Sequence, residues 1–186
     1  MKKVIFALAL ILGLTINASA QNYSVKQGYK GFLEAGYIFS LNDLEFATSQ
    51  KYGPSSMSRI ELTTSHGIQL NPYLFLGGGV SLDCCTESLY FAAPLFVNAR
   101  VTPLVGNITP FVDVKGGYSL GYIQGPYFSA NIGCRFGLTR NVGLNVGVGY
   151  SFISVSKRQY IYDPLNKFAG ERMLTNGFGI NVGFDF

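Results

Sequence analysis

His66 is the only histidine of this chain, so a Ser-His-Asp triad or a histidine metal site would have to be built around it. Its neighbours Thr64 and Ser65 bring hydroxyl groups but no carboxylate that would orient the imidazole ring. Catalysis by histidine needs such a partner. We therefore interpret His66 as a residue without a catalytic role, and we identify no catalytic residue elsewhere in the sequence.

The three cysteines give neither a disulfide pattern nor a metal-binding pattern. Cys84 and Cys85 are adjacent, in a segment that we expect to form an exposed loop, and Cys134 is expected on a strand far from that loop. A disulfide between sequence neighbours is strained, and the distance to Cys134 is too long for pairing. The C-x-x-C spacing of metal sites is also absent from the sequence. We expect free thiols, no metal and no other cofactor.

A run of three glycines, Gly77 to Gly79, fits part of a phosphate-binding loop. Such a loop continues with Lys-Ser or Lys-Thr and then a helix, and neither follows here. The glycines lie inside a strand pattern, where glycine permits tight curvature or close packing of an interior side chain. No nucleotide site is predicted.

The first twenty residues have the pattern of a secretory signal peptide. Lys2 and Lys3 form its charged start, an apolar run from Val4 to Ile16 follows, and Ala18 to Ala20 form a small-residue cleavage site. We expect residues 1–20 to be removed after export through the Sec pathway, leaving one domain over residues 21–186.

Composition indicates a membrane protein rather than a soluble one. Charged residues make up 13% of the chain, against roughly 25% in ordinary soluble domains, and aromatic residues make up 15%. Removal of the two leader lysines lowers the basic count from 14 to 12 against 10 acidic residues, a net charge of +2. This balance gives no support for nucleic-acid binding. After the leader, no apolar run approaches the roughly 18 residues of a membrane helix, so a membrane form would be a closed sheet.

Alternation of apolar and small or polar residues predicts eight strands. The last segment is the clearest, because Phe178, Ile180 and Val182 alternate with Gly179 and Asn181. The predicted strands are near the length that a tilted membrane strand requires, and they span residues 29–39, 59–70, 73–82, 90–101, 111–118, 128–138, 143–152 and 177–186. We predict a closed antiparallel eight-stranded transmembrane β-barrel, an all-β fold.

The connections and the two strand faces agree with this barrel. Short turns are expected at 71–72, 103–109 and 139–141, and longer loops at 40–58, 83–89, 119–125 and 154–175, which places both termini on the short-turn side. The apolar face carries no charge and has aromatic residues near many strand ends, as expected for a face that meets lipid. These aromatic residues are Tyr29, Tyr37, Phe39, Phe91, Tyr118, Phe128, Phe136, Tyr150, Phe152 and Phe186.

The C-terminal segment carries a resemblance to a known family. Ile180, Val182, Phe184 and Phe186 alternate with small or polar residues up to the aromatic end of the chain. The segment resembles the C-terminal signal that the barrel assembly machinery reads. With its leader, the chain is similar to small OmpA/OmpX-type outer-membrane barrels, especially the barrel-domain proteins common in Bacteroidetes. One enzyme type with this fold acts on lipid A through a lipid-facing histidine, but Ile68 stands where that type has its serine.

The other strand face is predicted to line a narrow lumen and to hold charged residues of both signs. Five are basic and four acidic, so we expect an interior ion-pair network rather than a proton or ion path, because eight strands leave little free volume. Antiparallel pairing is expected to bring Arg100, Asp113 and Arg135 together. The nine predicted network residues are Lys30, Glu34, Arg59, Glu61, Arg100, Asp113, Lys115, Arg135 and Asp185.

The predicted function is that of an integral barrel of the Gram-negative outer membrane that displays loops and has no open pore. The longest loop carries basic and aromatic residues that could bind lipopolysaccharide phosphates, or that merely keep the loop soluble. These residues are Lys157, Arg158, Tyr160, Tyr162, Lys167 and Arg172. Outer-membrane lipids, the assembly machinery and an unidentified surface or host ligand are the expected partners. The alternatives are a lipid-A-modifying enzyme built around His66 and a narrow channel.

Overall fold

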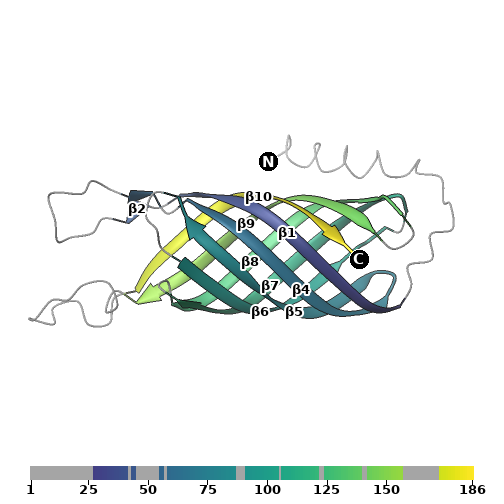
Figure 1. Ribbon diagram of the computed structural model, residues 1–186, viewed down its shortest axis with the longest axis horizontal. Coiled ribbons are helices and arrows are strands. Elements are labelled where there is room, and N and C mark those ends of the chain that lie inside the picture. Colours follow the sequence, from purple (N-terminus) through teal and green to yellow (C-terminus); the bar gives the residue numbers. More distant parts are fainter. Residues whose placement is uncertain are drawn as a thin grey trace, which may run out of the picture.

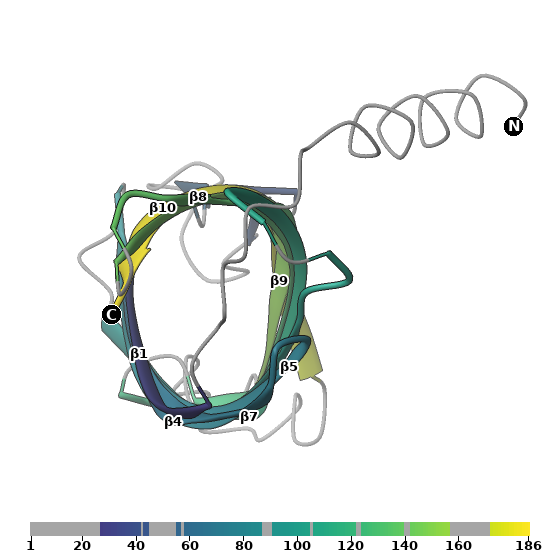
Figure 2. The ribbon, with the colours of Figure 1, turned by 90° about the vertical axis from the view of Figure 1, so that its right-hand side faces the viewer.

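The chain folds as a closed barrel of eight antiparallel strands (Figure 1). The computed structural model describes residues 27–41, 43–44, 55–56, 58–86, 91–104, 106–121, 124–139, 142–156 and 172–186. Viewed along its axis, the barrel is a slightly oval ring of strands (Figure 2). Its strands are β1 (Gly28–Ser40), β4 (Arg59–Asn71), β5 (Leu74–Cys85), β6 (Phe91–Val101), β7 (Ile108–Gly121), β8 (Gly125–Gly137), β9 (Gly143–Ser156) and β10 (Arg172–Asp185).

Each strand pairs with its sequence neighbour, and β1 pairs with both β4 and β10 to close the ring. The eight predicted strands are therefore confirmed. A two-stranded sheet of β2 (Asp43–Leu44) and β3 (Ser55–Ser56), which was not predicted, lies in the connection between β1 and β4. Among the residues that the structure describes, no helix is long and apolar enough to cross a bilayer.

Several strands extend further than predicted at the end of the barrel that carries the long connections, which we call the loop end. β5 continues to Cys85 instead of stopping at Leu82, and β9 and β10 reach Ser156 and Arg172, inside the predicted 154–175 loop. The predicted 83–89 loop therefore began too early, because residues 83–85 belong to β5. Inward Ser81, Asp83 and Cys85 still alternate with outward Leu82, so the period-two pattern runs past the predicted boundary.

The opposite end, which we call the turn end, has compact connections. Between β4 and β5, the Asn71 side-chain oxygen accepts hydrogen bonds from the backbone N–H groups of Tyr73 (2.8 Å) and Leu74 (2.9 Å). This local bond explains why an asparagine precedes the turn. The first barrel strand starts and the last one ends at the turn end, because the strand number is even (Figure 1).

The outward face is an apolar belt, and the inward face is polar. Val97, Ile132 and Ile180 lie near the middle of their strands with 71%, 59% and 52% of their surfaces exposed. On the eight strands, every charged side chain that the structure describes faces the lumen instead. A soluble barrel would hide its apolar face inside, so this arrangement is that of a protein whose solvent is lipid.

The last residue of the chain completes the closing pair of strands. The Phe186 N–H donates to the Gly31 carbonyl (3.0 Å), and the Gly31 N–H donates to the Phe186 carbonyl (2.8 Å). The Phe186 ring also covers Gly31, because a Cβ atom added there would lie 2.7 Å from ring atom Cε2. A side chain at this position would displace the ring from the seam.

A charge placed on the belt should destabilise the barrel according to its depth. Ile132→Arg, near the middle of β8, should lower the free energy of unfolding in liposomes by about 2–4 kcal/mol. The matched control is Ile108→Arg at the turn end of β7, which should cost about 0–1 kcal/mol because arginine there reaches the interface. Denaturant unfolding of both variants measures the difference. Equal costs at the two positions would contradict the assignment of this face to lipid.

Candidate functional site

The lumen holds three clusters of charged side chains, and all nine residues predicted there face inward. The central cluster comprises Glu34, Arg100, Asp113 and Lys115. The turn-end cluster comprises Lys30, Arg135 and Asp185. The loop-end cluster comprises Arg59, Glu61 and Asp83, of which Asp83 was not predicted to be luminal.

The central cluster is a closed arrangement of two cations and two anions. Arg100 forms ion pairs with Glu34 and with Asp113 (3.4 Å), and Lys115 forms pairs with Glu34 (2.9 Å) and Asp113 (3.6 Å). All four side chains are at most 5% exposed. Each charge thus has two partners of opposite sign, which offsets the cost of removing it from water.

Two aromatic rings hold the Arg100 guanidinium in the middle of the lumen. Its carbon Cζ lies 4.0 Å from the centre of the Phe32 ring and 4.3 Å from the centre of the Phe111 ring. A planar guanidinium stacks on such rings while its edge donates hydrogen bonds. Phe75, which is buried, packs edge-on against Phe32 with 4.9 Å between the ring centres.

The turn-end cluster is centred on Asp185, the penultimate residue. Lys30 lies 3.1 Å from its Oδ2 atom, and Arg135 lies 2.8 Å from its Oδ1 atom. Asn145 donates a further hydrogen bond to Oδ1 (3.0 Å) and lies beside Arg100, whose Nη1 is 3.4 Å from Oδ1 of Asn145. Asn145 therefore links this cluster to the central one.

The predicted grouping of Arg100, Asp113 and Arg135 is only half right. Arg100 and Asp113 are direct cross-strand partners in the β6–β7 register. In the β7–β8 register, Asp113 lies opposite Asn131, and Arg135 lies opposite Thr109. Arg135 is therefore two inward positions closer to the turn end and pairs with Asp185 instead.

The loop-end cluster contains the residue that the sequence reasoning missed. Asp83 is 1% exposed, and its Oδ2 lies 3.2 Å from Arg59 Nε. Arg59 also reaches across the lumen to donate to the Ser151 hydroxyl (2.7 Å). Continued alternation after Ser81 was the signal that could have placed Asp83 inside the barrel.

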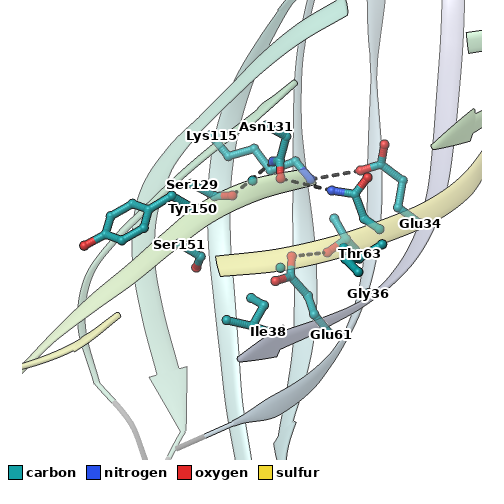
Figure 3. Close-up of a pocket in the computed structure, with 14 residues that line it drawn as sticks. Glu34, Gly36, Ile38, Glu61, Thr63, Lys115, Ser129, Asn131, Tyr150 and Ser151 are labelled. Carbon is teal, nitrogen blue, oxygen red and sulfur yellow. Dashed lines mark hydrogen bonds and ion pairs between the residues drawn. The ribbon is translucent and has the colours of Figure 1, made fainter. Parts of the chain in front are cut away.

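Uncharged polar residues and a small cavity occupy the space between the central and loop-end clusters (Figure 3). Asn181 donates to the side-chain oxygen of Asn131 (3.0 Å), and Asn131 donates to Ser129 (3.1 Å). The cavity has a volume of about 20 Å³ and is lined by Glu34, Glu61 and Lys115 among others. That volume suits about one water molecule and not a solute.

His66 lies on the lipid-facing side of β4, close to the closing seam. Its Nδ1 is 2.6 Å from the Tyr29 hydroxyl, and its Nε2 is 3.0 Å from the Thr64 hydroxyl. The Phe186 ring lies edge-on at 6.4 Å. Both ring nitrogens are thus engaged by hydroxyl groups, and no orienting carboxylate is among the partners that the structure describes for this residue.

The cysteines and the glycine run have structural positions. Cys84 and Cys85 are the last two residues of β5, so the prediction that they lie in a loop was wrong. All three cysteines are free thiols in the structure. At Gly77 an added Cβ would lie 2.6 Å from the ring of Phe75, so this glycine makes room for an interior side chain as predicted.

Most of the predicted loop site and the predicted signal peptide lie outside the described residues. This holds for residues 1–20 and for Lys157, Arg158, Tyr160, Tyr162 and Lys167. Arg172 is the first residue of β10 rather than a loop residue. In contrast, the four residues of the predicted assembly signal are described, and they all point outward: Ile180, Val182, Phe184 and Phe186.

Comparison with solved structures finds the same fold in small outer-membrane proteins. Neisserial surface protein A (NspA) matches with a TM-score of 0.59 and 12% identity, over 85% of this chain and 96% of that one. Outer membrane protein OprG from Pseudomonas aeruginosa matches with a TM-score of 0.50 and 10% identity, over 89% and 98%. No protein-family model matches the chain, and no curated protein matches it in sequence.

Removal of one anion from the central cluster should be costly. Asp113→Ala leaves Arg100 and Lys115 with Glu34 alone, so we expect a loss of about 3–5 kcal/mol in the free energy of unfolding. The additional change Lys115→Met restores neutrality, so the double variant should lose less than the sum of the two single variants. Urea unfolding in detergent micelles measures all four proteins. Wild-type stability of Asp113→Ala would show that the cluster is not dry.

Proposed function

We propose that the chain is an integral protein of the Gram-negative outer membrane with a structural or surface-interaction role. In this role it displays loops outside the membrane and conducts no solutes. The observation that carries the proposal is the combination of an uncharged apolar exterior with a lumen whose charges neutralise one another.

The exterior supports the location in a membrane. Large apolar side chains are exposed along all eight strands, and aromatic residues flank them near strand ends, such as Tyr29 (69% exposed) and Phe39 (53%). Aromatic girdles of this kind lie at the two membrane interfaces of outer-membrane barrels. The same exterior in water would form an apolar patch far larger than monomeric soluble proteins expose.

The interior supports the absence of a pore. A channel needs a continuous water path, whereas here Arg100 fills the section between Phe32 and Phe111. Ion pairs from Arg100 and Lys115 to Glu34 also cross the lumen between strands that are not neighbours in the sheet. Eight-stranded barrels in general are wide enough only for their own side chains. The narrow-channel alternative has no comparable support.

The partners stay predictions. The outward row of Phe186, Phe184 and Val182 fits recognition by the barrel assembly machinery. Binding of lipopolysaccharide by the basic and aromatic residues of the 157–171 connection fits the chemistry of anionic sugar phosphates, since arginine and lysine bind phosphate. An interaction with a host or neighbouring surface molecule would use the same connections.

The proposal predicts a membrane-inserted protein without conductance. Purified protein in detergent should migrate faster before boiling than after, because the closed barrel stays compact. In planar bilayers it should give no discrete conductance steps. The triple variant Phe32→Ala, Phe75→Ala, Arg100→Ala is the positive control, because it empties one section of the lumen. A monodisperse protein in detergent-free buffer, or open channels in the wild type, would refute the proposal.

The enzyme alternative is tested at His66. His66→Ala should leave the acyl pattern of lipid A in expressing cells unchanged, because the partners of this ring are Tyr29 and Thr64 hydroxyls and not a carboxylate. Mass spectra of lipid A from cells with wild-type protein, His66→Ala protein and no protein measure this. A modification that appears with the wild type and disappears in the variant would establish the enzyme instead.

A further inference from the structure

Glu61 and Asp83 place two carboxyl groups directly opposite each other inside the barrel. They are cross-strand partners in the β4–β5 register; Asp83 is 1% exposed, and Glu61 is half-buried. Like charges in this position destabilise a sheet, and burial increases the repulsion. Arg59 is the only cation of the loop-end cluster, so the cluster has one positive charge against two negative ones when both carboxyls are ionised.

The charges on the neighbouring strands do not compensate for this excess. Lys115 on β7 is close enough to interact electrostatically with Glu61, but it forms its ion pairs with Glu34 and Asp113, and the four charges of the central cluster already sum to zero. The other ionisable groups near the pair are Glu34 on β1, Cys85 on β5 and Tyr127 on β8. None of these supplies a positive charge.

Two hydroxyl groups join the carboxyl groups in a continuous chain of oxygen atoms. Thr63 Oγ1 lies 2.8 Å from Glu61 Oε1 and 3.0 Å from Ser81 Oγ, and Ser81 Oγ lies 2.6 Å from Asp83 Oδ1. Figure 3 shows the Thr63–Glu61 end of this chain beside the cavity. The chain therefore contains three hydrogen-bond contacts, all at normal donor–acceptor distances.

A count of protons shows what the chain requires. Three contacts need three hydrogen atoms, but two hydroxyl groups supply only two. With both carboxyls ionised, Thr63 would donate to Glu61 and Ser81 to Asp83, and the two hydroxyl oxygens would face each other 3.0 Å apart with no hydrogen between them. One additional proton on either carboxyl group satisfies all three contacts.

We propose that Glu61 and Asp83 form a proton-binding site that holds one proton between them through Thr63 and Ser81. A proton from the solvent binds to the Asp83 carboxylate. The protonated Asp83 then donates a hydrogen bond to the Ser81 hydroxyl. Ser81 donates in turn to Thr63, and Thr63 donates to Glu61. The reverse direction places the proton on Glu61, and a concerted shift of the three hydrogens interconverts the two forms. With the proton bound, the loop-end cluster is neutral together with Arg59.

Tyr127 gives an independent indication that the site has a further occupant. Its hydroxyl is buried, on a residue that is 2% exposed, and it makes no hydrogen bond of normal geometry, with Ser129 as the polar side chain beside it. The charged groups that act on this hydroxyl are Glu61, Asp83 and Arg59. The cavity that Glu61, Thr63 and Ser129 line has room for about one water molecule, and a water molecule there would deliver the proton.

Infrared spectroscopy of the full protein in detergent tests the proposal. Wild-type protein near neutral pH should show the carbonyl band of one protonated carboxylic acid, with an isotope shift in heavy water. Asp83→Asn and Glu61→Gln should each lose this band, because the remaining carboxylate balances Arg59. Asp185→Asn, in the turn-end cluster, is the matched control and should keep it. The shift on boiling verifies that each variant is folded.

A second measurement follows the release of the proton. As pH rises, the wild type should lose the band and resist urea less, because two ionised carboxyls then share one arginine. Asp83→Asn should keep its resistance over the same range. No band in folded wild-type protein at any pH above the ordinary carboxyl range would overturn the proposal. So would stabilisation by Na⁺ over choline without a band, since the occupant would then be a metal cation.

Discussion

Backbone hydrogen bonding in a medium without water is the constraint on which this structure depends. Each N–H and C=O group that meets hydrocarbon must find a partner within the chain, and a sheet achieves this only when its first and last strands pair. In this protein that pairing joins β1 to β10, and the terminal Phe186 extends it by two backbone bonds to Gly31. The close approach of the Phe186 ring to Gly31 follows from closure and not from any local preference of β1.

Closure with only eight strands then determines the chemistry of the interior. A lumen of this width excludes bulk water, so each inward charge needs a protein partner. The partners come from across the lumen: Arg59 on β4 reaches Ser151 on β9, and Lys115 on β7 reaches Glu34 on β1. Small residues opposite these side chains provide the space. At Gly143 a Cβ atom would lie 2.5 Å from both Arg135 Nε and Asp185 Oδ1, so even alanine would disturb that ion pair.

The fold was predictable from the sequence because every strand of a closed membrane barrel alternates outward apolar residues with inward polar or small residues, and this period-two pattern is visible in the sequence. The pattern gave eight strands and the correct inward face for each charged residue predicted there. It failed where a polar residue inside a strand looks like a loop residue, as with Asp83 at the loop end of β5. It also failed for Arg135, because the alternation specifies a face and not the stagger between strands. Which charges meet depends on that stagger, and the sequence does not reveal it directly.

The same constraint explains why the fold is shared at such low identity. Two outer-membrane proteins with 12% and 10% identity match most of this chain, because the outward face needs only apolar side chains and the backbone supplies the pairing. Features particular to this protein must therefore lie in the connections and in the luminal charged residues, whose identities are not determined by closure of the sheet.

Inside the lumen, the charged residues must also balance one another in sign. The central cluster is balanced, with two cations and two anions, whereas the loop-end cluster has one arginine for two carboxyl groups. The interior thus balances its charges at the centre, has one cation more than it has anions at the turn end, and lacks one positive charge at the loop end when both carboxyl groups there are ionised.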